Sequence, residues 1–306
     1  MIRTKHSFVL VCALALLAGM LAPSTAAQAK RAITFDDLIG MHRVSDPKIS
    51  PDGKWVSYTV ATPDKAANRS NRNVWLAATA GGDTRQLTRS GRDGTARWSP
   101  DGSKLAFISS RDGSAQIYVI ALEGGEATKI SSISTGVDWL AWSPDGKSIA
   151  FTSRVYPACK DDACNAKRDK DAEASKVKAR IYDNLLYRHW TEWWDYKRSH
   201  LFVMPATGGA WRDLLEGAEY DVPPVQRGGP EGIAWSPDSK ELCFTAVTDK
   251  MEAISTDANL FTVPAAGGAT KKLTTNTGFD SDPVYSPDGK WIAYRSQPRA
   301  GRPRPR

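Results

Sequence analysis

The chain has 306 residues and a formal net charge of +7, and 41% of its residues are hydrophobic. This length and composition are those of a globular protein that can bury a substantial core, which excludes a disordered chain. The charge lies at the two ends, because residues 1–29 carry +2 and residues 298–306 carry +4, so the near-neutral remainder gives no electrostatic argument for a nucleic-acid partner.

The first 29 residues have the pattern of a secretory signal peptide. Arg3 and Lys5 precede an apolar stretch from Phe8 to Leu21, and a small-residue cleavage site follows at residues 27–29. The apolar stretch is too short for a spanning helix, although a retained N-terminal anchor is the competing interpretation. We therefore expect a periplasmic or secreted protein with no membrane span once the signal peptide is removed.

One turn-forming phrase occurs five times along the chain. It reads Ser-Pro-Asp-Gly at residues 50–53, 99–102, 143–146 and 286–289, and Ser-Pro-Asp-Ser at residues 236–239. Proline presets the backbone of the turn, and glycine takes the left-handed conformation that closes a hairpin. Ser239 replaces that glycine, so we expect its turn to be slightly strained. An aromatic residue precedes four of the copies: Trp98, Trp142, Trp235 and Tyr285.

Each turn is followed by segments that predict the strands of one sheet. The first has a small residue between two large ones, as in Leu105-Ala106-Phe107, and later strands are expected at residues 74–78, 116–120, 200–204 and 259–263. Glycine pairs then mark hairpin turns before a short fourth strand. Four-stranded antiparallel units that repeat every 44 to 50 residues predict an all-β fold, a β-propeller. An open β-array or a sandwich is the alternative, which the regular spacing disfavours.

One spacing of 93 residues indicates a blade enlarged by an insertion. We place this insertion at residues 156–199, in the third blade. Val177, Ile181 and Leu185 are spaced as on one face of a helix, so part of it is expected to be helical, with an extended strand as the alternative.

The fifth blade has only two expected strands, because the chain becomes rich in arginine and proline after Ser296. The incomplete propeller therefore spans residues 30–297, as four blades and a partial fifth, and residues 298–306 are expected to form a disordered tail. Such a propeller leaves open sheet edges. We interpret the chain as a truncated or frame-shifted product, or as one that needs a partner to close it.

The sequence offers no constellation for nucleophilic catalysis. The four histidines are His6, His42, His189 and His200, and no Gly-x-Ser-x-Gly elbow occurs. The ordinary interpretation of His42 and His200 is structural, so we expect no catalytic residue in this chain.

Cofactor and metal sites are also not expected. Cys159 and Cys164 lack a second cysteine or histidine pair at zinc spacing, which favours a small loop disulfide over two free thiols. Cys243 stands where other blades have a small packing residue. Asp101 and Asp145 have the spacing of turn formers rather than of calcium ligands, and no phosphate-binding loop is present.

The aromatic half of the insertion is the segment that blade packing does not explain. Its candidate substrate-recognition residues are Arg188, His189, Trp190, Glu192 and Trp193. Aromatic anchors with a few charged groups are typical of recognition surfaces. The alternative is that these aromatic residues attach the insertion to the propeller.

Taken together, these features resemble the exported, bacterial-type prolyl-oligopeptidase family of serine peptidases, in its acylaminoacyl- or dipeptidyl-peptidase-like branch. The resemblance covers about residues 31–297 and rests on residues 33–38, residues 44–47, the repeated turn, and Tyr187-Arg188-His189-Trp190 with residues 200–203. The turn alone is less specific, because TolB-like propellers share it.

The resemblance implies that an N-terminal propeller caps a C-terminal α/β-hydrolase domain and admits only short or unfolded peptides to a Ser-Asp-His triad. No triad residue can be transferred to this sequence, because the hydrolase domain is absent from it. The expected function is thus the substrate-gating propeller region of an exported serine exo- or oligopeptidase, catalytically silent in this chain, whose full-length parent takes peptide substrates. The alternative is a stand-alone TolB-like periplasmic propeller that binds a protein partner.

Overall fold

The computed structural model describes residues 31–183, 185–225, 232–297 and 299–301, so the expected signal peptide lies outside the described residues. The chain divides into two units between Met41 and His42. The described part of the first unit holds helix α2 (Phe35–Gly40), which a capping box starts: Thr34 and Asp37 each accept a hydrogen bond from the other's backbone N–H. Within the described ranges, no helix is long and apolar enough to cross a membrane.

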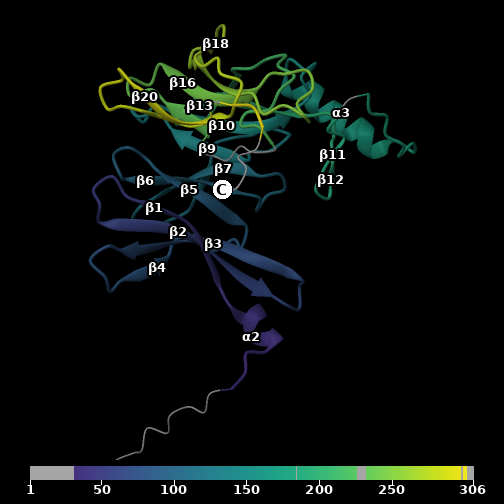
Figure 1. Cartoon of the computed structure of the whole chain (residues 1–306). Helices are drawn as coiled ribbons and strands as arrows, with labels where there is room; N and C mark the ends of the chain where they lie inside the picture. The colour runs from purple at the N-terminus through teal and green to yellow at the C-terminus, as the bar shows by residue number, and fades with distance from the viewer. Residues whose placement is uncertain (1–30, 184, 226–231, 298, 302–306) are drawn as a thin grey trace, which may run out of the picture. The chain divides into compact units, whose positions relative to one another are not determined.

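The second unit is built from antiparallel sheets in which neighbouring strands follow one another along the chain (Figure 1). The first sheet is β1 (Arg43–Ile49), β2 (Trp55–Asp64), β3 (Arg69–Ala78) and β4 (Thr84–Gln86). The second is β5 (Asp93–Trp98), β6 (Lys104–Ser109), β7 (Gln116–Ala121) and β8 (Thr128–Lys129). The third is β9 (Trp139–Trp142), β10 (Ser148–Val155), β13 (Arg198–Pro205) and β14 (Arg212–Asp213).

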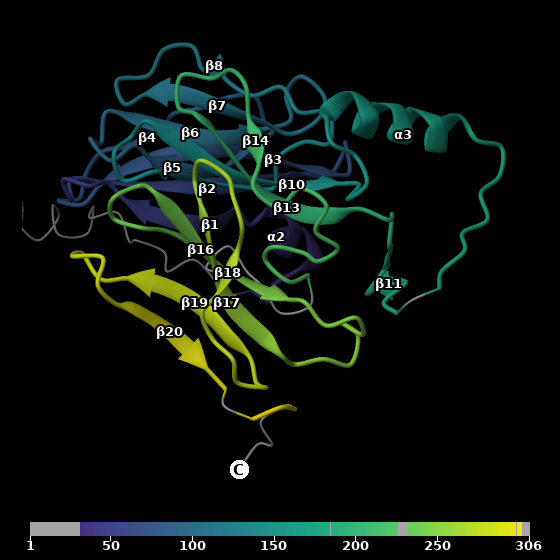
Figure 2. The ribbon, with the colours of Figure 1, turned by 90° about the horizontal axis from the view of Figure 1, so that it is seen from above.

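The fourth sheet is β15 (Ile233–Trp235), β16 (Glu241–Val247), β17 (Ala258–Pro264) and β18 (Lys271–Lys272). A two-stranded sheet, β19 (Asp280–Tyr285) and β20 (Ile292–Ser296), packs against this fourth sheet (Figure 2). The predicted fold class, four propeller blades and a partial fifth, is confirmed.

Each Ser-Pro-Asp turn joins the first two strands of one blade. In the second blade, the Ser99 hydroxyl donates to Asp101 Oδ1 at 2.5 Å and accepts from the Lys104 N–H at 3.0 Å. Equivalent pairs of bonds recur in the other four turns. The four glycines have φ of 70–72°, and Ser239 has φ of 62°, so the predicted left-handed position is confirmed.

Successive turns touch one another. A Cβ atom on Gly102 would lie 3.5 Å from Pro51 Cδ, and one on Gly146 would lie 3.7 Å from Pro100 Cδ. Where serine replaces glycine, the Ser239 hydroxyl instead accepts a hydrogen bond from the Asp145 N–H of the preceding turn at 3.0 Å. The turns of neighbouring blades therefore support each other along one end of the sheets.

A tryptophan before three of the turns links its blade to the preceding blade. In three blades, the indole N–H donates to the backbone carbonyl two residues before the serine of the previous turn. The pairs are Trp98 with Lys48, Trp142 with Arg97 and Trp235 with Ala141, at 3.0, 3.1 and 3.4 Å. Tyr285 replaces tryptophan in the fifth blade, and its hydroxyl donates to Glu241 Oε1 at 2.8 Å.

Hydrophobic clusters fill the spaces between consecutive blades. Leu105 and Phe107 on β6 point toward the first blade, whereas Ala106 between them faces the third. The predicted alternation of large and small residues thus lets each sheet bury both of its faces. Cys243 occupies the small position of the fourth blade, is fully buried, and has its pKa raised to about 12 by that burial.

The insertion leaves the third blade between β10 and β13. It carries helix α3 (Asp162–Ala174) and the hairpin of β11 (Arg188–His189) and β12 (Glu192–Trp193) (Figure 2). The helix does not include Val177, Ile181 or Leu185, which are largely exposed. The charged segment is helical instead, because Asp161 caps its first turn by accepting a hydrogen bond from the Cys164 N–H.

Local contacts attach α3 to the third blade. A disulfide joins Cys159, just after β10, to Cys164 in the first turn of the helix. The Tyr156 N–H donates to Asn165 Oδ1 at 2.9 Å, and the Tyr156 hydroxyl donates to Asp169 at 3.0 Å. Burial and that carboxylate raise the pKa of Tyr156 to about 12, which keeps the phenol neutral as a donor.

We predict that Trp142→Phe lowers the free energy of unfolding by about 1–2 kcal/mol, because it removes one inter-blade hydrogen bond and leaves the Arg97 carbonyl without its indole donor. Urea unfolding followed by circular dichroism measures the change. Trp291→Phe is the matched control, since Trp291 is 75% exposed. Equal losses in the two variants would contradict the structural role of the indole bond.

The lowered pKa of a turn carboxylate leads to a second prediction, about the pH dependence of stability. Hydrogen bonds from Ser99 and then from Ser103 lower the pKa of Asp101 to about 2, from an ordinary value of 3.8. A lowered folded-state pKa contributes stability above the ordinary value, and this contribution disappears as the pH falls toward the folded-state value. The melting temperature should therefore fall less steeply between about pH 4 and pH 2 in Asp101→Asn than in the wild type. Identical slopes would contradict this origin.

Candidate functional site

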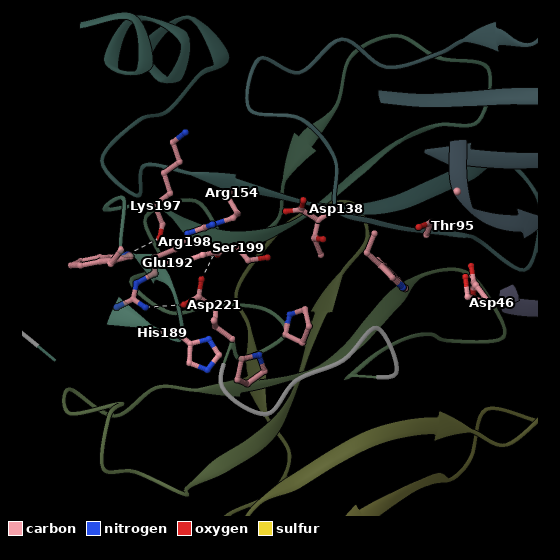
Figure 3. A pocket seen from close by; sticks show the side chains of 18 of the residues that line it. Asp46, Thr95, Asp138, Arg154, His189, Glu192, Lys197, Arg198, Ser199 and Asp221 are labelled. Atoms are coloured by element: carbon pink, nitrogen blue, oxygen red, sulfur yellow. Dashed lines mark hydrogen bonds and ion pairs between the residues drawn. The ribbon is translucent and has the colours of Figure 1, made fainter. Parts of the chain in front are cut away.

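A cavity of about 960 Å³ lies among the strand ends that are remote from the turns (Figure 3). Its walls come from strands of the first three blades, from the segment after β14 and from the β11–β12 hairpin. This volume is within the range of pockets that hold small ligands. Asp46 and Thr95 lie on one side of it, and His189, Glu192 and Asp221 lie on the other (Figure 3).

The first two blades meet in the cavity through an ion pair. Arg97 Nη1 on β5 lies 2.7 Å from Asp46 Oδ2 on β1. Asp46 and Thr95 stand four residues before the serine of their turns, and both have positive φ, 52° and 53°. The strand register shifts at both positions, as in β-bulges. Bulges redirect side chains, and here they turn these residues toward the cavity.

The wall formed by the start of β13 is held by buried ion pairs. Arg198 Nη1 lies 2.8 Å from Asp221 and 2.9 Å from Glu252, and its guanidinium also lies 5.0 Å from the centre of the Trp194 ring. Burial raises the pKa of Glu252, although Arg198 opposes this shift. Next to it, Lys197 reaches Asp169 of α3 at 2.7 Å. These pairs fix the wall on which the hairpin of the insertion lies.

Charges of both signs in the cavity lack a partner. Among the described residues, the carboxylates of Asp138 and Glu192 make no ion pair or hydrogen bond, and the guanidiniums of Arg43 and Arg72 make no ion pair. Desolvation by the surrounding protein raises the pKa of Asp138, and nearby Arg154 opposes the shift. The cavity therefore presents unpaired cations and anions, a combination that suits a ligand carrying both.

Three of the five residues predicted for recognition line this cavity: His189, Glu192 and Trp193. Arg188 does not line it but places its guanidinium 5.7 Å from the centre of the Trp193 ring. Trp190, at the tip of the hairpin, is 84% exposed and is not part of the wall. Whether any of the five contacts a substrate stays a prediction.

The hairpin aromatics also stabilise the insertion itself. Tyr182 packs against four other rings, at centroid distances of 5.5 to 6.4 Å: Tyr187, Trp193, Trp194 and Tyr196. The Trp194 indole donates to the Lys197 carbonyl at 2.9 Å, which ties this cluster to the start of β13. The same aromatic segment therefore attaches the insertion to the third blade and lines the cavity.

Sequence analysis missed the wall residues supplied by the blades. Positions four and five before the repeated serine line the cavity in the first three blades: Ser45 and Asp46, Gly94 and Thr95, Asp138 and Trp139. The repeat itself carries this signal, because equivalent positions of successive blades face the same space. The arginines of β1 and β3 carry no such signal.

His200 has the structural role that the sequence suggested. It is 1% exposed, its Nδ1 lies 2.7 Å from Asp213 Oδ2, and its Nε2 lies 2.9 Å from the Ala218 carbonyl oxygen. Both ring nitrogens are therefore occupied, so neither is available to activate a nucleophile. In the part of the chain that the structure describes, no group of three or more metal-ligating side chains gathers.

Comparisons with known proteins identify what the chain is similar to. Residues 30–173 match the TolB beta propeller domain. The chain is 30% identical to dipeptidyl-peptidase 5 of Porphyromonas gingivalis over 97% of its own length and 43% of that protein. It is 31% identical to the uncharacterized peptidase YuxL of Bacillus subtilis, over 87% of its own length and 31% of that protein. The chain thus spans less than half of the curated relatives it matches.

A solved structure shares the fold. The acylaminoacyl peptidase of Pyrococcus horikoshii superposes on 85% of this chain and 36% of its own length, with a TM-score of 0.61 and 15% sequence identity. At this identity the similarity concerns the fold alone.

The ion pairs of Arg198 lead to a prediction about stability. Arg198→Met leaves Asp221 and Glu252 buried without their cation, so we expect the free energy of unfolding to fall by about 3 kcal/mol at neutral pH. The deficit should shrink toward acidic pH, because Glu252, whose pKa burial raises, then becomes neutral. Urea unfolding across a pH series measures this.

The control for this variant is Arg295→Met. Arg295 pairs with Asp282 at 3.0 Å, but its side chain is 81% exposed, so the expected loss is below about 1 kcal/mol. A deficit in Arg198→Met that does not change with pH would contradict the assigned pairing.

Proposed function

We propose a function from this premise: the chain is a TolB-type β-propeller related to dipeptidyl-peptidase 5, and thus to the propeller regions of prolyl-oligopeptidase-family peptidases. In our proposal it is the substrate-gating propeller region of an exported serine exo- or oligopeptidase. It binds peptides and carries no catalytic group for their hydrolysis.

The observation that carries this proposal is the cavity at the strand ends. It combines an aromatic hairpin with unpaired charges of both signs, Arg43 and Arg72 on the first blade and Asp138 and Glu192 on the third. Short peptides carry ammonium and carboxylate groups and large side chains, which these wall residues complement. The cavity volume of about 960 Å³ suits a peptide segment and excludes a folded domain.

The walls of this cavity support gating. The hairpin of the insertion lines it from one side, and ion pairs hold the opposite wall and the start of β13. A ligand must therefore fit between fixed elements. In this proposal, the hydrolysis of an admitted peptide proceeds by way of an acyl-enzyme and needs catalytic groups other than the residues that line this cavity.

Export belongs to the proposal as well. The basic start, the apolar stretch and the small-residue cleavage site of residues 1–29 support secretion or release into the periplasm. A disulfide between Cys159 and Cys164 is compatible with an oxidising compartment.

The proposal predicts that Trp193→Ala weakens the binding of a short, unstructured peptide about tenfold, because Trp193 lines the cavity. Isothermal titration calorimetry on the purified chain measures the affinity. Trp190→Ala is the matched control on the same hairpin: Trp190 is 84% exposed and outside the wall, so its replacement should leave the affinity unchanged. Circular dichroism checks that both variants keep their fold.

The reverse ranking of the two variants would contradict peptide binding in the cavity. A loss confined to Trp190→Ala, with a folded protein as the ligand, would instead support the stand-alone TolB-like propeller, whose exposed hairpin tip would contact its partner. Release of a chromophore from aminoacyl or dipeptidyl substrates by this chain would contradict catalytic silence.

A further inference from the structure

Three arginines form a row that runs over strands β1, β2 and β3 to the residue before β5. Arg43 on β1 pairs with Ala61 on β2, and Ala61 pairs with Arg72 on β3. A parallel bridge then joins Arg72 to Arg92, which directly precedes β5. Residues that are paired across strands place their side chains on the same face of the sheet. The row therefore continues from the first blade into the second.

Two adjoining cavities share this row. Arg43 and Arg72 line the main cavity, and Arg72 and Arg92 line a second one of about 390 Å³. Arg72, Gly94 and Thr95 belong to both walls. The arginines are thus concentrated in a concave place rather than spread over a convex surface, where solvent would screen them more.

No carboxylate neutralises the row among the described residues. Two acids in these walls already have cations: Asp46 pairs with Arg97 at 2.7 Å, and Asp93 pairs with Arg111 at 2.9 Å. Among the described residues, the guanidinium of Arg92 donates only to the Ser110 carbonyl oxygen. Like charges directly opposite each other on a sheet are destabilising, so the ligand-free chain keeps Arg72 and Arg92 together at a cost in stability.

An unsatisfied hydroxyl points to a ligand at the same place. Thr59 lies on β2 two residues before Ala61, and therefore on the same face as the row. It lines the main cavity, it is 5% exposed, and its Oγ1 has no hydrogen-bond partner in the described structure. A buried hydroxyl without a partner is costly, and a ligand oxygen that reached it after a small movement of the surrounding side chains would satisfy it.

We propose that Arg43, Arg72, Arg92 and Thr59 form a carboxylate-binding site for a peptide in the cavity. Guanidinium groups match the two oxygens of a carboxylate, and a threonine hydroxyl adds a neutral donor. The carboxylate is either an acidic side chain or the C-terminus of the peptide. This inference rests on the proposed function and adds the chemical class of ligand that the site selects.

Calorimetry with three N-acetylated peptides of otherwise identical neutral sequence tests the proposal. One ends in a free carboxylate, one in an amide, and one in an amide with a single internal glutamate. We expect a carboxylate peptide to bind roughly tenfold tighter than the neutral amide. The preferred peptide identifies the source of the carboxylate, and raised ionic strength should weaken its binding.

Variants separate this site from general binding. Arg72→Gln should weaken the binding of the carboxylate peptides more than that of the neutral amide, and so remove the preference for carboxylate. It should also raise the melting temperature of the ligand-free chain, because it relieves the repulsion in the row. Lys129→Gln, on the exposed outer strand β8 of the second blade, removes the same charge elsewhere and should change neither property. Thr59→Val should weaken only the carboxylate peptides.

Two results would overturn the site: equal affinity for all three peptides, or equal weakening of all three by Arg72→Gln. Glutarate, followed by its effect on the melting temperature, separates this failure from failure of the proposed function. If no peptide binds but glutarate stabilises the wild type and not Arg72→Gln, the carboxylate site stands and peptide gating fails. If glutarate stabilises neither, the carboxylate site is wrong.

Discussion

The hydrogen bond from an indole to the carbonyl of the preceding blade is the contact on which this structure depends. It recurs three times with the same offset, two residues before the repeated serine. Because that offset is constant, each first strand has the same position relative to the strand before it. In the first three blades, the residues four and five before the serine therefore meet in one place, and the cavity follows from the repeat.

The bulges beside the cavity have a conformational cost. Asp46 and Thr95 have left-handed backbone conformations that residues other than glycine seldom adopt. The surrounding sheets hold these bulges in place, and the Asp46–Arg97 pair bridges two blades across them. Strained backbone is tolerated where it redirects side chains toward a site. Here the redirected groups are the charged and polar wall of the cavity.

The fold and the charges of the cavity depend in part on different residues. A solved structure at 15% sequence identity shares this fold. The hairpin of the insertion lies outside the repeated turns and the large–small alternation of the blades. The ligand preference that we propose therefore depends in part on residues that the repeat does not supply.

The blades could be predicted from the sequence, because the turn and the strand alternation of each one depend on residues close together in the chain. Ser99, Asp101 and Gly102 form their turn among themselves, and the large–small alternation of β6 needs only the two-residue period of a strand. Three of the residues predicted for recognition, His189, Glu192 and Trp193, line the cavity, and their contact with a substrate stays a prediction.

The sequence does not predict which distant residues meet, because their contacts depend on how the strands pair. Arg43, Arg72 and Arg92 are separated by about twenty or more residues, and strand pairing alone brings them into one row. The helix of the insertion formed in its charged part, because a capping aspartate and contacts with Tyr156 outweigh the apolar spacing of Val177 and Ile181. Such choices depend on long-range contacts and burial, which a local pattern of residue types does not contain.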